Sequence, residues 1–192
     1  MKQKPIQRFH SLYDDDGQRK YLTLDERQAF AEVANQEEGI ALTFCGMLLH
    51  TGCRISEALA LTADRVDLKQ KKIVIESLKK RRNGVYRSVP VPDIFLKELD
   101  LVHGVRAAQA AKARGRRQRL WPWSRTTAWR LIKRVLREAG IDGGQCATAK
   151  GLRHGFAKGP RRRAALARVL RGCWFRLRAP RTVAAGTRIR TT

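Results

Sequence analysis

The sequence predicts a mainly α-helical domain with a small antiparallel β-hairpin sheet, an α+β fold. Apolar residues recur at helical spacing through residues 24–49 and again through 124–136. Between these stretches, residues 72–77 and 85–91 are rich in β-branched residues and flank an Asn-Gly pair. A length of 192 residues suits one domain with a sizeable core.

Two helices are expected at the start of the domain. Thr23 and Glu26 form a capping-box pattern, which predicts a helix that begins there and ends near Asn35. The following stretch, residues 40–49, is apolar on most faces, as in a buried central helix. Gly52 is placed to end this second helix.

A short helix is expected over residues 55–61. After it, the helical spacing of apolar residues gives way to strand-like runs. Residues 72–77 and 85–91 then read as two strands, and Asn83-Gly84 is a strong hairpin signal between them. The residues before this turn are basic. The sequence therefore predicts a β-hairpin with a basic tip.

Helices are expected again after the hairpin. Pro92 opens a helix that runs through Val102 and decays into Ala and Arg, and a basic loop follows at residues 115–119. Ser124 is placed to cap the last clear helix. The predicted apolar face of that helix consists of Trp129, Ile132, Val135 and Leu136.

The chain divides into three parts. Residues 1–22 are predicted to be a polar, flexible lead-in, and residues 23–157 the domain. Residues 158–192 contain ten arginines and no Asp or Glu. Such an acid-free stretch is unlike a solvated globular surface, so we expect a poorly ordered tail. Out-of-frame GC-rich codons yield Arg, Ala, Gly and Pro, and a frameshift near Ala157 or Lys158 is one hypothesis for its origin.

The charge indicates a polyanionic partner. The chain has 41 Lys and Arg against 17 Asp and Glu, for a formal net charge of +24. Double-stranded DNA is therefore the expected partner. The four cysteines and four histidines are scattered, so no metal site and no cofactor are expected. Without a signal peptide or an apolar run long enough to span a bilayer, the sequence predicts a cytoplasmic, nucleoid-associated protein.

Two arginines stand in distinctive frames: Arg54 in Thr51–Leu59 and Arg153 in Lys150–Ala157. A guanidinium group is planar, always charged and able to bind two phosphoryl oxygens, so the pair predicts a phosphate clamp. Further cations of the hairpin tip, the basic loop and the last helix are expected to contact DNA. These are Lys80, Arg81, Arg82, Arg116, Arg117, Arg130, Lys133 and Arg134.

From about Leu22 to Phe156 the chain resembles the catalytic domain of the tyrosine recombinases, the phage-integrase-like enzymes that break and rejoin DNA. Residues 51–57 resemble the family's first arginine box, and residues 151–156 resemble its second. The basic hairpin lies between them, as it does in the family. The resemblance implies that Arg54 and Arg153 bind the nonbridging oxygens of the scissile phosphate. It also implies that a hairpin lysine protonates the leaving 5′ oxygen. We assign this role to Lys79, with Lys80 as the alternative one residue on.

The chain departs from the family pattern in three places. One is the Leu-Gly-His-like or tryptophan-bearing turn expected after Arg153, for which Trp174 is only a loose match. Lys150 stands where the second box usually opens with histidine, and it could still hydrogen-bond a phosphate. No tyrosine follows Arg153, since the only tyrosines are Tyr13, Tyr21 and Tyr86. The resemblance therefore implies a site-specific recombinase by descent that does not form the covalent phosphotyrosyl intermediate.

Two alternatives follow from the missing nucleophile. The protein could be a non-catalytic DNA-binding protein that occupies recombination sites, or another recombinase subunit could supply the tyrosine. The sequence also leads us to expect marginal stability, with apolar surface around Phe44, Leu48 and Trp129 incompletely covered.

Overall fold

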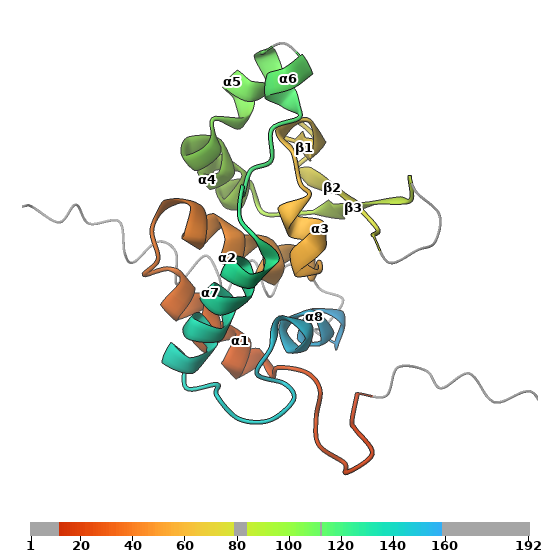
Figure 1. Ribbon diagram of the computed structural model, residues 1–192, viewed down its shortest axis with the longest axis vertical. Helices are drawn as coiled ribbons and strands as arrows, with labels where there is room; N and C mark the ends of the chain where they lie inside the picture. Colours follow the sequence, from red (N-terminus) through yellow and green to blue (C-terminus); the bar gives the residue numbers. More distant parts are fainter. Residues whose placement is uncertain (1–11, 79–83, 112, 159–192) are drawn as a thin grey trace, which may run out of the picture.

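The computed structural model describes residues 12–78, 84–111 and 113–158, which form helices around one central helix with a small sheet beside them (Figure 1). In chain order the elements are α1 (Leu24–Ala34), α2 (Gly39–Thr51), α3 (Ile55–Leu59), η1 (Ala63–Arg65), β1 (Val66–Asp67), β2 (Lys72–Glu76), β3 (Tyr86–Pro90), α4 (Asp93–His103), α5 (Val105–Ala110), α6 (Ala113–Arg116), α7 (Arg125–Glu138) and α8 (Ala149–Lys158). Figure 1 shows α5 and α6 at one end of the molecule and α1, α7 and α8 toward the other. The predicted α+β class is confirmed.

Helix α2 is the centre of the core. Every residue from Thr43 to Thr51 is buried, and the helix packs against α1, α4 and α8. The prediction of uncovered apolar surface at Phe44 and Leu48 is wrong, because their side chains are 0% and 1% exposed. Phe44 packs edge-on against the buried ring of Trp121. Residues distant in sequence therefore close the core around α2.

The capping box predicted for α1 is confirmed. The backbone N–H of Glu26 donates to the hydroxyl of Thr23 at 3.2 Å, and the N–H of Thr23 donates to the Glu26 carboxylate at 2.9 Å. The carboxylate also pairs with Arg19. Because these bonds satisfy donors at the helix terminus, they fix where α1 begins.

Residues 12–22, part of the predicted flexible lead-in, contact the domain. Tyr13 and Arg19 form an isolated β-bridge. Leu22 is 2% exposed, and its N–H donates to the carbonyl of Gly151 in α8 at 3.2 Å. In the described part of the lead-in, the packed structure thus begins before Thr23. The predicted tail at 159–192 and the lead-in at 1–11 lie outside the described residues.

Gly52 ends α2 as predicted. Its φ of +58° is in the left-handed region that favours glycine, and its N–H donates to the carbonyl of Leu48 at 3.0 Å. A Cβ at this position would lie 2.6 Å from the ring of Phe156. The turn at Gly52 therefore sets Arg54 at the start of α3 and lets α8 approach the end of α2.

The predicted hairpin is confirmed in its strands. β2 and β3 pair antiparallel with Ile73 opposite Val89. The basic tip at residues 79–83 lies outside the described residues. β1 adds a third strand through the pair Val66 and Ile73, and the sequence analysis missed it because two residues are too short to show an alternating pattern.

The region after the hairpin differs from the prediction. The expected single helix is split at Gly104, which has a φ of +59° and closes α4 before α5 begins. The loop predicted at 115–119 is partly wrong, because α6 includes Gly115 and Arg116. Ala and Arg are strong helix formers, and a single glycine costs only about 1 kcal/mol in a helix. A short helix can therefore form there.

Helix α7 begins after Ser124 as predicted, and the Ser124 hydroxyl accepts the N–H of Thr127 at 3.1 Å. Its predicted apolar face needs one correction. Ala128 is buried together with Ile132, Val135 and Leu136, whereas Trp129 is 49% exposed. Since neighbouring residues project about 100° apart on a helix, burying Ala128 turns Trp129 away from the core.

Helix α8 lies very close to the turn before it. A Cβ added at Gly151 would fall 1.9 Å from the backbone carbonyl oxygen of Cys146. We predict that Gly151→Ala lowers the free energy of unfolding by about 1–3 kcal/mol, because backbone atoms must shift to admit the methyl group. Urea unfolding would measure this change.

Gly143→Ala is the matched control. A Cβ at Gly143 would meet nothing within 4 Å, and its backbone is not in the left-handed region. Its expected effect is within about 0.5 kcal/mol. Equal stabilities of Gly151→Ala and the unsubstituted protein would contradict the packing described for α8.

Candidate functional site

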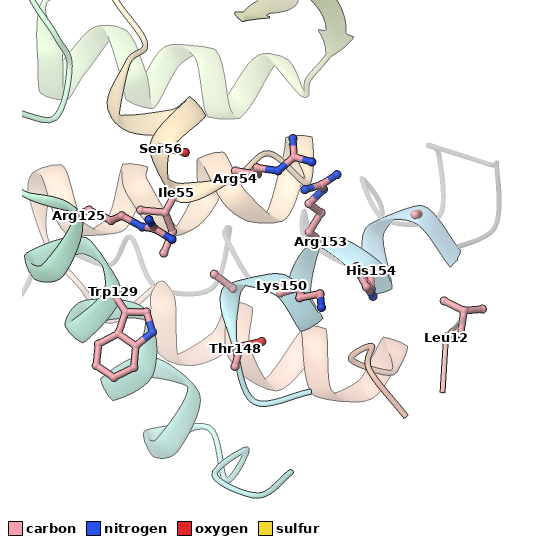
Figure 2. Close-up of a pocket in the computed structure, with 12 residues that line it drawn as sticks. Leu12, Arg54, Ile55, Ser56, Arg125, Trp129, Thr148, Lys150, Arg153 and His154 are labelled. Carbon is pink, nitrogen blue, oxygen red and sulfur yellow. The ribbon is translucent and has the colours of Figure 1, made fainter. Parts of the chain in front are cut away.

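A pocket of about 650 Å³ opens between α3, α7 and α8 (Figure 2). Leu12, from the segment before α1, also lines it. The polar and charged side chains of the lining are Arg54, Ser56, Arg125, Thr148, Lys150, Arg153 and His154. The volume lies within the range of about 300–1,000 Å³ that is usual for ligand pockets.

Arg54 is fixed by the local geometry of its own turn. It directly precedes α3, and its backbone N–H donates to Oε2 of Glu57 at 3.1 Å. Its Nη1 donates to Oε1 of the same carboxylate at 2.5 Å. With 29% of its side chain exposed, Arg54 keeps part of its guanidinium group available to the pocket.

Glu57 joins this arginine to the β-sheet. Its side chain is 0% exposed, and Oε2 also accepts from Nη2 of Arg87 in β3 at 2.7 Å. Burial alone would raise the pKa of Glu57, but the hydrogen bonds from Arg87 and Arg54 outweigh it and lower the pKa. A buried carboxylate thus ties the hairpin to the start of α3.

Arg153 reaches the same place from α8. Figure 2 shows its guanidinium group beside that of Arg54. Burial lowers the pKa of Arg153, and the positive charges of Arg54 and Arg87 act in the same direction, while Glu57 opposes them. No ion pair involves Arg153 within the described residues. The sequence-predicted pair is therefore brought together, and a bound anion would relieve its repulsion.

Lys150 and His154 lie on the Arg153 side of the pocket. They are three residues before and one residue after Arg153 in α8, and both line the pocket. Lys150 is exposed, and His154 is half-buried. Thr148 accepts the N–H of Gly151 at 3.1 Å, which orders the start of the helix that carries these side chains.

None of the three tyrosines is among the pocket-lining residues. Side chains alternate along β3, so that of Tyr86 lies on the face opposite to that of Arg87. There the guanidinium carbon of Arg65 lies 4.5 Å from the centre of the Tyr86 ring. The hydroxyls of Tyr13 and Tyr21 lie 3.3 Å apart.

The structure does not test the hairpin cations. The positions predicted there, both for the proton donor and for DNA contacts, lie outside the described residues: Lys79, Lys80, Arg81 and Arg82. The contact between Arg87 and Glu57 nevertheless fixes the end of β3 nearest the hairpin tip beside the pocket.

Two predicted DNA-binding arginines lie far from the pocket. Arg116 and Arg117 are exposed at the end of α6, and Nε of Arg116 donates to the carbonyl of Ala111 at 3.0 Å. Figure 1 shows α6 at the end of the molecule away from α8. The structure does not bring this group together with Arg54 and Arg153.

The predicted cations of α7 have different environments. Arg130 is exposed. Lys133 is half-buried and donates to the carbonyl of Ala147 at 3.0 Å, and Arg134 pairs with Glu37 at 2.8 Å. None of these three lines the pocket. Lys133 therefore holds the loop before α8, a role that its place in a basic helix could not reveal.

The sequence analysis missed four residues of the site. Glu57 was quoted only as part of the first arginine box, and Arg87 only as part of a strand. Arg125 was not among the predicted DNA contacts. Trp129 was placed on the apolar face of its helix, and although its incomplete covering was expected and is found, it was not predicted to line the pocket. A signal existed for Arg125 and Trp129, since they are four residues apart and so share one face of α7.

Within the described ranges, no cluster of three or more His, Cys, Asp or Glu residues could hold a metal ion. No helix of the described chain is long and apolar enough to cross a membrane.

The arrangement of helices and sheet is that of tyrosine-recombinase catalytic domains. It is similar to the XerA recombinase, with 24% identity over 82% of this chain and 56% of that chain and a TM-score of 0.55. The XerH site-specific recombinase bound to difH substrate in a pre-cleavage complex has 19% identity, coverage of 75% and 47%, and a TM-score of 0.57. These likenesses show the fold.

A third similar structure is the Tn1549 transposon integrase in complex with transposon right end DNA. It has 19% identity over 83% of this chain and 61% of that chain, with a TM-score of 0.54. The chain spans about half the length of these proteins. Comparison with curated proteins found no match. A model of the phage integrase family matches residues 20–160, and the chain belongs to this family.

The buried carboxylate generates a prediction about stability. Glu57→Gln keeps the size of the side chain but removes the charge between Arg54 and Arg87. We expect a loss of about 1–3 kcal/mol in unfolding free energy at pH 7. Because folding lowers the pKa of Glu57, its contribution is present above the unfolded value of about 4.3 and is lost as the pH falls through the folded value.

The difference in unfolding free energy between Glu57→Gln and the unsubstituted protein should therefore shrink below about pH 4.3. Chemical denaturation across the pH range would measure it. Glu138→Gln is the control, since Glu138 forms an exposed pair with Arg134 on α7. That change should stay within about 0.5 kcal/mol. A Glu57→Gln effect that is independent of pH would contradict the charge-based role.

Proposed function

We propose that these residues form a DNA-binding domain of the recombinase type that holds one backbone phosphate between Arg54 and Arg153. The observation that carries the proposal is the convergence of two partly buried guanidinium groups on one pocket. Each can donate two parallel hydrogen bonds to phosphoryl oxygens. The repulsion between them makes an anionic ligand favourable.

The partner proposed is double-stranded DNA. A formal charge of +24 supplies sequence-independent attraction to the phosphate backbone. The printed descriptions of two similar structures, a XerH complex with difH and a Tn1549 integrase complex with transposon DNA, support the same class of ligand. Assembly with other recombinase subunits on one DNA site belongs to this proposal.

We assign the remaining roles by analogy with strand transfer in the family. Lys150 hydrogen-bonds the held phosphate from the start of α8. In the family's strand transfer a hairpin lysine supplies a proton to the leaving 5′ oxygen, and we assign Lys79 to that position, although no bond is cut in the proposed binding activity. Arg54 and Arg153 stabilise negative charge on the phosphate. Lys79 belongs to the hairpin tip. Glu57 holds Arg87, near the tip end of β3, beside the pocket.

Cleavage is not part of the proposed activity of these 192 residues. Strand transfer through a phosphotyrosine requires a phenolic oxygen in line with the phosphate. The described tyrosines do not line the pocket, and the sequence contains none after Tyr86. The proposed function is therefore occupation of recombination sites by a domain descended from a recombinase.

DNA binding tests the clamp. Arg153→Ala should weaken binding of a fluorescent duplex about tenfold or more, since it removes a charge-assisted contact to phosphate. The slope of log affinity against log salt should also fall by about 0.9. Fluorescence anisotropy over a series of salt concentrations measures both quantities.

Arg106→Ala is the charge-matched control. Arg106 lies on α5, away from α8 in Figure 1, and is exposed beside Asp100. It should leave the affinity within about threefold and the slope unchanged. Equal losses in the two variants would show that binding depends on net charge alone and would contradict a specific clamp.

A separate assay tests the absence of cleavage. We expect no DNA adduct that survives boiling in detergent when the protein is mixed with a pool of nicked duplexes of randomised sequence. An intact tyrosine recombinase with the same pool is the positive control. A stable adduct on this chain would overturn the non-catalytic assignment.

A further inference from the structure

We propose that the α7 side of the pocket is a nucleotide subsite, in which the indole of Trp129 stacks on an unpaired base next to the phosphate held by Arg54 and Arg153. This inference rests on the proposed function and adds the part of the DNA that the pocket selects. It assigns Trp129 a binding role.

Trp129 is available for a ligand. It is 49% exposed, whereas Ile132 and Val135 on the buried face of the same helix are at most 1% exposed. The indole N–H of the buried Trp121 donates to the carbonyl of Ile40 at 3.0 Å. Within the described chain Trp129 has neither a hydrogen bond nor a ring contact.

The surroundings of Trp129 make this more than a single exposed aromatic. Arg125 lies four residues earlier, one turn away on the same face of α7, and lines the same pocket. Figure 2 shows both side chains on α7, on the opposite side of the view from Arg153 on α8, and both line the pocket. Ile55 and Ala149 add apolar lining.

The pocket therefore has a cationic end and an aromatic end. Arg54, Arg153 and Lys150 suit a phosphate, and Trp129 suits a flat apolar group attached to it. A nucleotide combines the two, and a volume of about 650 Å³ can accommodate one. Arg125 would neutralise a neighbouring phosphate of the same strand.

The chemistry favours an unpaired base over a paired one. In a regular duplex, neighbouring base pairs cover the faces of each base, and only its edges are open to a protein. A base that leaves the stack exposes a face to an aromatic side chain, as in single-strand binding. The subsite should therefore distinguish DNA that is distorted beside the held phosphate from regular duplex.

Two short fluorescent duplexes that differ only by one unpaired nucleotide test the proposal. Trp129→Ala should lower the affinity for the duplex with the unpaired nucleotide about 5- to 150-fold. Its affinity for the fully paired duplex should change by less than about twofold. Trp129→Phe, which keeps an aromatic face, should retain most of the affinity.

Intrinsic fluorescence gives a second measurement. The unpaired duplex should quench tryptophan emission of the unsubstituted protein, and Trp129→Phe should lose this quenching although it still binds. Thermal melting checks that each variant folds. We expect both to fold, because Trp129 is half-exposed and its replacement leaves the core unchanged.

The outcomes separate this proposal from the one on which it rests. If the unsubstituted protein binds neither duplex, the proposed DNA-binding function fails. If it binds and Trp129→Ala binds each duplex as tightly as the unsubstituted protein does, only the subsite is wrong. A loss of the same size for both duplexes would also overturn it, since Trp129 would then contact regular DNA.

Discussion

The close approach of α8 to the end of α2 is the constraint on which the phosphate site depends. Gly52 both turns the chain and leaves room for the ring of Phe156. The buried guanidinium group of Arg27 joins the two helices from α1, because it donates to the carbonyls of Leu49 and Gly155 at 3.3 and 3.5 Å. The carbonyl of Leu49 lies near the C-terminus of α2, where a positive charge is favourable. Burial lowers the pKa of Arg27 to about 10, so it stays charged at neutral pH.

This packing explains how two arginines from distant parts of the chain come to share a ligand. Arg54 is positioned by the end of α2, and Arg153 by the helix packed against it. The carboxylate of Glu57 offsets part of the positive charge and is itself occupied by Arg54 and Arg87. Arg153 forms no ion pair in the described chain, so the site keeps an excess of positive charge. The geometry that brings the two arginines together thus also favours an anion beside them.

The sequence predicted the parts of the fold that depend on neighbours along the chain. The capping box at Thr23, the turn at Gly52 and the cap at Ser124 each involve residues within four positions, and all three are confirmed. The family resemblance predicted that Arg54 and Arg153 would meet. The partnership of Glu57 with Arg87 was missed because it joins a helix to a strand and leaves no local pattern. Trp129 was misassigned because periodicity shows that a helix has an apolar side but not which edge of that side meets a pocket.

Binding and cutting make separate demands on such a site. Holding a phosphate requires fixed cations, and these come from α3 and α8 within the packed core of the domain. Cutting requires in addition a nucleophile placed in line with the phosphorus atom, which is a demand on one further segment of chain. Loss of that segment's tyrosine would leave the electrostatics of the pocket intact, because Arg54, Glu57 and Arg87 hold one another in place without it and Arg153 is carried by α8. A recombinase fold can therefore lose strand transfer and keep the physical basis for occupying DNA.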